Sequence, residues 1–169
     1  MLMVTQFILI LFIFFTAIFA LFFIYISFDK FIHKKIKTDT SNLSISILQL
    51  GVILSSAIIF KAIILPVINL ISIGINQQNT NFTRLFENIS LVLLFLSIGL
   101  IFTVIIVFSA LYLFMKLTKI DEFEDIKNNK TYTSIVLSSI IIGLSIIMES
   151  SIGHLCEIII PFSNLIQIF

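Results

Sequence analysis

Two ionisable side chains, Lys61 and Glu149, stand well inside long apolar stretches of the sequence. Ionisable groups at membrane depth usually face the interior of a helix bundle, pair with each other or line a path for ions. The two residues occupy equivalent positions in the two halves of the chain, so they could form an ion pair. The alternative is that each side chain reaches the interface on the outer side of the same membrane. About 27 Å of helix separates each residue from its helix start near Leu43 or Thr131, which is almost the full thickness of the hydrocarbon core.

A second group of reactive side chains lies in the last apolar stretch. His154 and Glu157 are three residues apart and share one face of a helix, with Cys156 between them. Two ligands do not close a zinc site, which takes three or four, and the polar end of a membrane helix would carry the same residues. We therefore predict no metal and no cofactor.

The sequence contains no Ser-His-Asp spacing, phosphate-binding loop or paired catalytic carboxylates. We therefore predict no catalytic residues and no enzymatic activity.

The composition indicates a membrane protein. Of the 169 residues, 59% are hydrophobic and only 11% are charged, and the mean hydropathy is +1.21. Soluble domains carry about 25% charged residues, so lipid must cover most of this surface. The formal net charge of +1 gives no field that would attract nucleic acid, and we expect membrane lipid as the immediate partner.

Apolar stretches long enough to cross a bilayer occur four times, which predicts an all-α polytopic protein with four transmembrane helices. The second pair of helices resembles the first, with Lys61 and Glu149 in register. We therefore predict two parallel two-helix repeats in residues 1–75 and 85–169, joined by a polar linker at 76–84.

Small residues recur one helical turn apart in both repeats. Gly51 and Ser55 in the first repeat correspond to Ser139 and Gly143 in the second. Small residues let helix backbones approach closely in lipid, so we expect these four to pack helices together, and we expect the chain to form a homo-oligomer or to join other membrane subunits.

Two segments, residues 29–42 and 116–130, carry most of the lysines. The positive-inside rule places both in the cytoplasm and both chain termini outside. The spacing of Phe28, Phe31, Ile32 and Ile36 favours a short amphipathic helix lying in the membrane interface.

The stretch IKNNKTYTSIVLSSIIIG, which follows the acidic DEFED, resembles the bacterial inner-membrane family called domain of unknown function 350. The family pattern is an acidic residue, Leu/Ile-Ile-Lys, Gly-Asn, a run of Ala and a Gly-rich helix start. The residues that fit this pattern are Asp125, Ile126, Lys127, Ile135, Leu137 and Gly143.

The chain also departs from that pattern, with Lys130 in place of Asn and with Thr133 and Ser134 in place of Ala. The first repeat keeps Asn42, Ser44, Ser46, Ile47 and Gly51, without the acidic lead. The resemblance implies a small four-helix inner-membrane protein and implies no established activity.

These observations favour a structural or accessory subunit of a membrane assembly. The alternative is a small oligomeric channel or transporter that uses Lys61 and Glu149.

Overall fold

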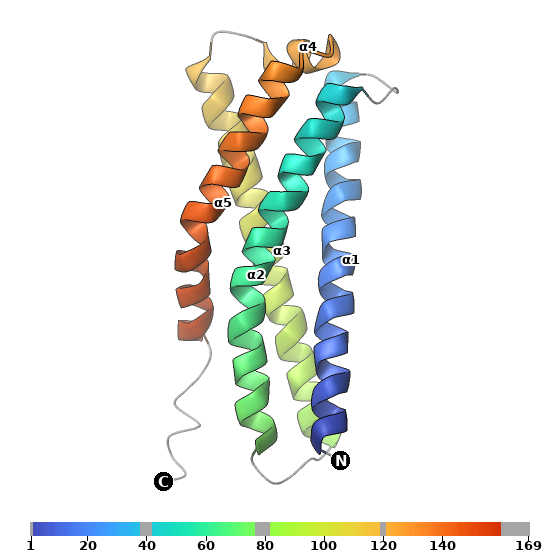
Figure 1. Ribbon diagram of the computed structural model, residues 1–169, viewed down its shortest axis with the longest axis vertical. Coiled ribbons are helices and arrows are strands. Elements are labelled where there is room, and N and C mark those ends of the chain that lie inside the picture. The colour runs from blue at the N-terminus through green and yellow to red at the C-terminus, as the bar shows by residue number, and fades with distance from the viewer. Residues whose placement is uncertain (1, 38–41, 77–81, 119–120, 160–169) are drawn as a thin grey trace.

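Long apolar runs without glycine-rich or proline-rich interruptions form helices, because a helix satisfies every backbone hydrogen bond inside lipid. The computed structural model describes residues 2–37, 42–76, 82–118 and 121–159 (Figure 1). The elements are α1 (Leu2–Ile36), α2 (Leu43–Asn76), α3 (Phe82–Leu117), α4 (Glu122–Lys127) and α5 (Thr131–Ile159).

Four of these helices, α1, α2, α3 and α5, are long and apolar enough to cross a membrane. The predicted fold class, an all-α protein with four membrane-spanning helices, is therefore confirmed. α2 continues as a helix through Pro66 to Asn76, so the apolar segment after Pro66 belongs to the same helix. α4 is a short helix across one end of the bundle (Figure 1).

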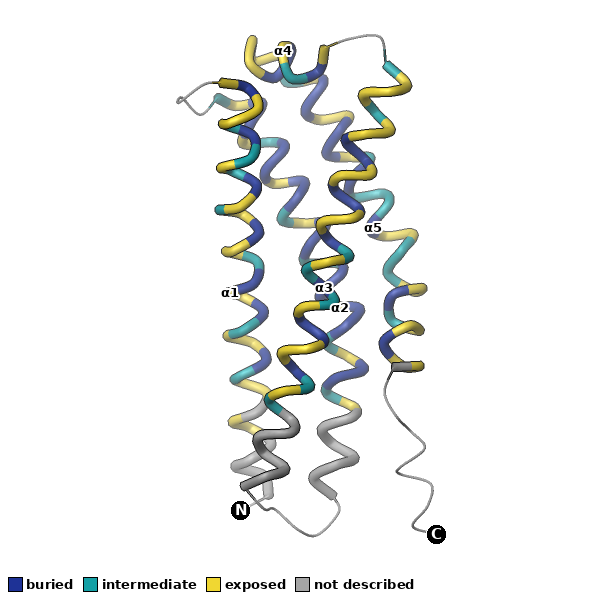
Figure 2. Tube along the Cα trace, turned by 180° about the vertical axis from the view of Figure 1, so that it is seen from behind, coloured by how far each residue is buried: buried dark blue, intermediate teal, exposed yellow. Residues whose placement is uncertain are grey.

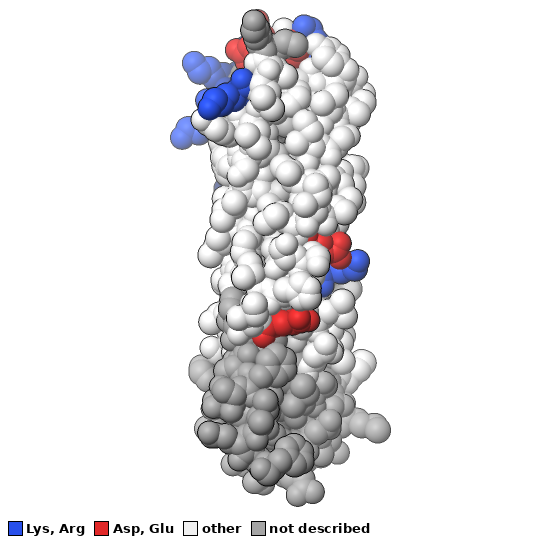
Figure 3. Space-filling model, turned by 90° about the vertical axis from the view of Figure 1, so that its left-hand side faces the viewer, with Lys and Arg blue, Asp and Glu red and all other residues white. Residues whose placement is uncertain are grey.

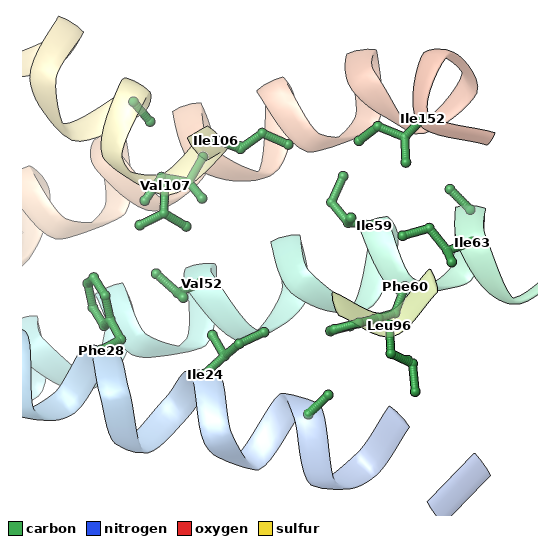
Figure 4. Packing of buried hydrophobic residues seen from close by; sticks show 14 of the residues in the cluster. Ile24, Phe28, Val52, Ile59, Phe60, Ile63, Leu96, Ile106, Val107 and Ile152 are labelled. Atoms are coloured by element: carbon green, nitrogen blue, oxygen red, sulfur yellow. The ribbon is translucent and has the colours of Figure 1, made fainter. Parts of the chain in front are cut away.

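The four long helices alternate in direction along the chain (Figure 1). α2 packs against α1, α3 and α5, and its contact with α5 is the most extensive in the bundle. Each helix buries one stripe of residues and exposes the other (Figure 2). The core is mainly apolar and includes Phe28, Phe60, Phe95 and Ile152, with buried Ser and Thr side chains among the apolar ones. Several of the apolar residues are seen in Figure 4.

The predicted interfacial helix near Phe28 is instead the last part of α1. Phe28, Ile32 and Ile36 are buried, and Phe31 makes an edge-on contact with Phe108 of α3 at 5.1 Å between ring centroids. The apolar stripe exists, but it packs against the other helices and not against the membrane surface. An interfacial helix and a packed transmembrane helix end have the same apolar periodicity, so the sequence alone does not distinguish them.

The α2–α5 contact runs through small residues. A Cβ atom on Gly51 would lie 2.5 Å from Cβ and 2.9 Å from Cα of Ser138, so the two helix backbones cross here. The Ser138 hydroxyl donates to the Ile47 carbonyl (3.1 Å), and Ser55 and Ser145 share a buried hydrogen bond. Gly51 and Ser55 therefore lie in the α2–α5 contact.

The α5 partners of that contact are Ser138 and Ser145, and the predicted Ser139 and Gly143 lie on another face of the helix. Ser139 is exposed and donates to the Ile135 carbonyl of its own helix, and a Cβ on Gly143 would meet nothing within 4 Å. In α5 one residue is about a quarter turn, at 3.6 residues per turn. The repeat alignment therefore identifies α5 as the helix that packs against α2, but it selects residues on a face of α5 that does not contact α2.

The two lysine-rich segments meet at the α4 end of the bundle. The Asn42 side chain caps α2 by accepting from Ile45 N (2.9 Å) and donates to the Ile126 carbonyl (2.8 Å). In return, Asn129 Oδ1 accepts from Ser44 N (3.1 Å). The start of α2 is thus tied to the turn between α4 and α5.

The division into two repeats stays a prediction, and its linker at residues 76–84 falls largely outside the described residues. The helix directions agree with it, because α1 and α2 run as α3 and α5 do (Figure 1).

Candidate functional site

Lys61 and Glu149, for which the sequence left pairing and separate exposure as alternatives, form an ion pair in the structure. Lys61 Nζ on α2 lies 2.9 Å from Glu149 Oε1 on α5. Both helices run parallel from the α4 end, and the crossing at Gly51 sets their register, so residues the same distance further along can meet. The geometry is that of a charge-assisted hydrogen bond.

The depth of this pair follows from a contact between α1 and α2. Gln49 Nε2 donates to Asp29 Oδ1 at 2.6 Å, so these two residues lie at the same level. Asp29 is the first charged residue along α1, so this level lies near the charged end of the bundle. Lys61 lies twelve residues beyond Gln49, about 18 Å along the helix, whereas the hydrocarbon layer of a membrane is about 30 Å thick.

The candidate membrane spans run from Leu43 to Asn69 in α2 and from Thr131 to Ile158 in α5. Lys61 and Glu149 lie inside these spans, far from the helix starts, and each supplies the counter-charge of the other.

The ion pair lies on the outside of the bundle. The side chain of Lys61 is 68% exposed and that of Glu149 is 31% exposed. Figure 3 shows charged side chains at the α4 end and a further group of acidic and basic side chains far below, with uncharged surface between them. We call the surface around the pair the outer face; it comprises Leu54, Lys61, Leu65, Ile146 and Glu149, which are wholly or partly exposed.

The other predicted candidates lie nearer the far end of α5. His154 Nδ1 is 3.2 Å from Glu157 Oε2, and both side chains are exposed. Glu157 is eight residues beyond Glu149, about 12 Å, which brings it to the far membrane surface. Cys156 is buried in the core and faces away from both. Within residues 2–37, 42–76, 82–118 and 121–159, no three His, Cys, Asp or Glu side chains gather.

A polar cluster that sequence reasoning missed lies at the junction of α4 and α5. Asp125 is 5% exposed and accepts from Lys130 Nζ (2.7 Å), Tyr132 OH (2.8 Å) and Thr133 Oγ1 (3.2 Å). The Lys130 and Tyr132 hydrogen bonds hold the pKa of Asp125 below its ordinary value. The hydrogen bond to Asp125 raises the pKa of Lys130. The cluster fixes the direction in which α5 leaves α4.

The sequence held a signal for this cluster. Asp125 stands at the acidic position of the family pattern quoted above, and the residue before Lys130 stands where that pattern has Gly. That residue, Asn129, has φ 58°, a left-handed conformation that Gly and Asn adopt most readily.

The family profile described as Domain of Unknown Function (DUF350) matches residues 84–168. The chain belongs to the DUF350 family. The DUF350 match covers α3, α4 and α5, including the Asp125 cluster, and its description assigns no catalytic activity. A comparison with curated proteins finds no match, and neither does one with solved structures.

DUF350 membership places the family module on the second half of the chain. The extension of the same module over the first half stays a prediction.

Proposed function

We propose that this protein is a non-catalytic subunit of an assembly in the bacterial inner membrane, and that it joins its partners through the outer face. The observation that carries the proposal is the Lys61–Glu149 ion pair, which lies inside two candidate membrane spans and is exposed on the outside of the bundle. A charged side chain in lipid costs several kcal/mol, so a neighbouring protein that covers the pair lowers its free energy.

The interior of the bundle supports the same proposal. Among the described residues of the four long helices, the buried polar side chains are Gln49, beside Asp29 at the α4 end, and Ser or Thr. Several of these hydroxyls bond to a carbonyl of their own helix, as Ser56 does to Val52 and Thr103 does to Gly99. In the described residues the charges lie outside this interior, so one copy offers no charged path through its own core.

The test is the native mass of the protein gently extracted from its own membrane. We expect stoichiometric foreign subunits with the wild-type chain. Lys61→Ala should release them, because it leaves Glu149 without its partner at the interface. Glu157→Gln is the control, since it changes a charge on the same helix near the membrane surface.

Recovery of the chain as a monomer in the wild type would contradict the proposal. So would retention of all partners in the Lys61→Ala variant.

A second function is favoured by one feature of the outer face. If several copies assemble with this face inward, Lys61 and Glu149 of each copy line a shared path, which would make the assembly a channel or transporter. A homo-oligomer without foreign subunits, with ion flux in liposomes that both Lys61→Ala and Glu149→Ala abolish, would support this candidate. Unchanged flux in both variants would exclude it.

A further inference from the structure

A long apolar groove lies between α1 and α3, away from the outer face and independent of the function proposed above. Its volume is about 430 Å³, within the roughly 300–1,000 Å³ of small-molecule sites. Val52 of α2 forms part of its floor, and Figure 4 shows Ile24 and Phe28 of α1 beside that residue. The groove opens toward the surrounding lipid, because Phe23 and Val104 on its walls are more than half exposed.

The length of the groove is close to the thickness of one membrane leaflet. Its α1 wall runs from Phe23 to Phe31, eight residues or about 12 Å, and half of the hydrocarbon layer is about 15 Å. The Phe31–Phe108 ring contact closes it at the α4 end. Thr103 is the one lining residue with a buried hydroxyl, and it donates to the Gly99 carbonyl. This hydroxyl therefore needs no hydrogen-bond acceptor from a ligand.

Two lysines lie on α1 at the α4 end of this wall. Lys30 and Lys34 lie three residues beyond Ser27 and Phe31 respectively, so they share the groove-facing side of α1. Both are exposed. Helical side chains lean toward the helix N-terminus, which directs these two ammonium groups back toward the groove.

Asp29, the acidic residue nearest to these lysines in sequence, contacts other side chains. Asp29 accepts from Gln49 at 2.6 Å and lies 3.3 Å from His33 Nε2. Among the described residues, the ion pairs of the chain involve neither Lys30 nor Lys34. An anionic group at this level would therefore meet two lysine side chains that form no ion pair within the described part of the chain.

We propose that the α1–α3 groove binds one acyl chain of an anionic phospholipid, whose phosphate lies against Lys30 and Lys34. The apolar lining takes the chain, the one-leaflet length matches its depth, and the two lysines recognise the charge of the headgroup. This makes the groove a specific lipid site and not general lipid contact.

The headgroup is tested by native mass spectrometry of the full-length protein with equal amounts of phosphatidylglycerol and phosphatidylethanolamine of identical chains. We expect wild type to retain phosphatidylglycerol in preference. The K30Q/K34Q variant should lose that preference several-fold. The control is K116Q/K127Q, which removes the same number of charges from exposed positions at the α4 end of the bundle, on α3 and α4.

The acyl chain is tested by filling the groove. Val104→Phe adds bulk on an exposed wall and should reduce retention of both lipids without lowering the melting temperature. Ile147→Phe, on an exposed position of α5, is the matched control and should leave retention unchanged.

The proposal is overturned if K30Q/K34Q and K116Q/K127Q retain phosphatidylglycerol equally, or if Val104→Phe retains lipid as wild type does. It is also overturned if Val104→Phe changes the oligomeric mass and not the lipid retention, since a second protein would then occupy the groove.

Discussion

Asp125 shows how a single acidic residue is held ionised at the edge of this bundle. Its carboxylate accepts from three side chains, and the Lys130 hydrogen bond is the leading cause of its lowered pKa. A carboxyl whose folded-state pKa lies below its unfolded value stabilises the fold above that unfolded value, and the stabilisation is lost as the pH falls through the folded-state pKa. The raised pKa of Lys130 acts in the opposite sense, so its contribution is lost only at strongly alkaline pH.

We predict that Asp125→Asn lowers the melting temperature at pH 7, because Lys130 loses its counter-charge. The difference in melting temperature between wild type and variant should narrow as the pH falls below 3.8, the ordinary pKa of this carboxyl. Thermal unfolding in detergent micelles across that range measures it. Glu124→Gln, at an exposed position on the same helix, is the control. A gap of constant size from neutral to acidic pH would show that the charge of Asp125 is not the cause.

At the scale of the element, the α2–α5 pair depends on the absence of a side chain at one position. Gly51 lies against Ser138 at a distance that leaves no room for a Cβ atom, because the close atoms include the Cα of Ser138. Gly143 offers the opposite environment, with open space around it. The two glycines therefore provide a matched pair of substitutions.

We predict that Gly51→Ala destabilises the bundle by about 1–3 kcal/mol, the usual cost of overpacking. Gly143→Ala should be neutral or stabilise by up to about 1 kcal/mol, because Ala favours the helix more than Gly does. Equilibrium unfolding in mixed micelles of both variants makes the comparison. Equal stabilities for the two would mean that α2 and α5 do not cross at Gly51.

The same helix pair shows what could be predicted from the sequence. Apolar stretches of bilayer length predicted the four long helices, and the equivalent positions of Lys61 and Glu149 allowed an ion pair without deciding between it and separate exposure. The choice between Ser138 and Ser139 was missed, because aligning repeats finds corresponding positions and does not say which face of α5 turns toward α2. The α1–α3 groove could not be predicted either, since it depends on the spacing of three helices.

At the scale of the whole molecule, both lysine-rich segments lie at the α4 end, because Asn42 bonds to the Ile126 and Lys127 carbonyls. The side of the membrane on which this end lies is a separate prediction from the positive-inside rule. Cysteine labelling can test the two statements independently.

We predict that Lys37→Cys and Lys127→Cys, each in a Cys156→Ser background, react with a membrane-impermeant maleimide only from the cytoplasmic side. Both positions are exposed. Labelling in intact cells and in inverted vesicles gives the readout. Reaction of the two positions from opposite sides would contradict the arrangement of the bundle, whereas reaction of both from outside would contradict only its orientation.

The reciprocal bonds of Asn42 and Asn129 also bear on how the chain is made. The hydrogen bonds that tie α2 to the α4–α5 turn join residues 84 and 85 positions apart. When α2 leaves the ribosome, the partners of its first turn have not yet been synthesised. The first turn of α2 therefore lacks these hydrogen bonds until Ile126 and Asn129 have been synthesised. A nascent chain released before the α4–α5 turn would not form the contact between this turn and the start of α2.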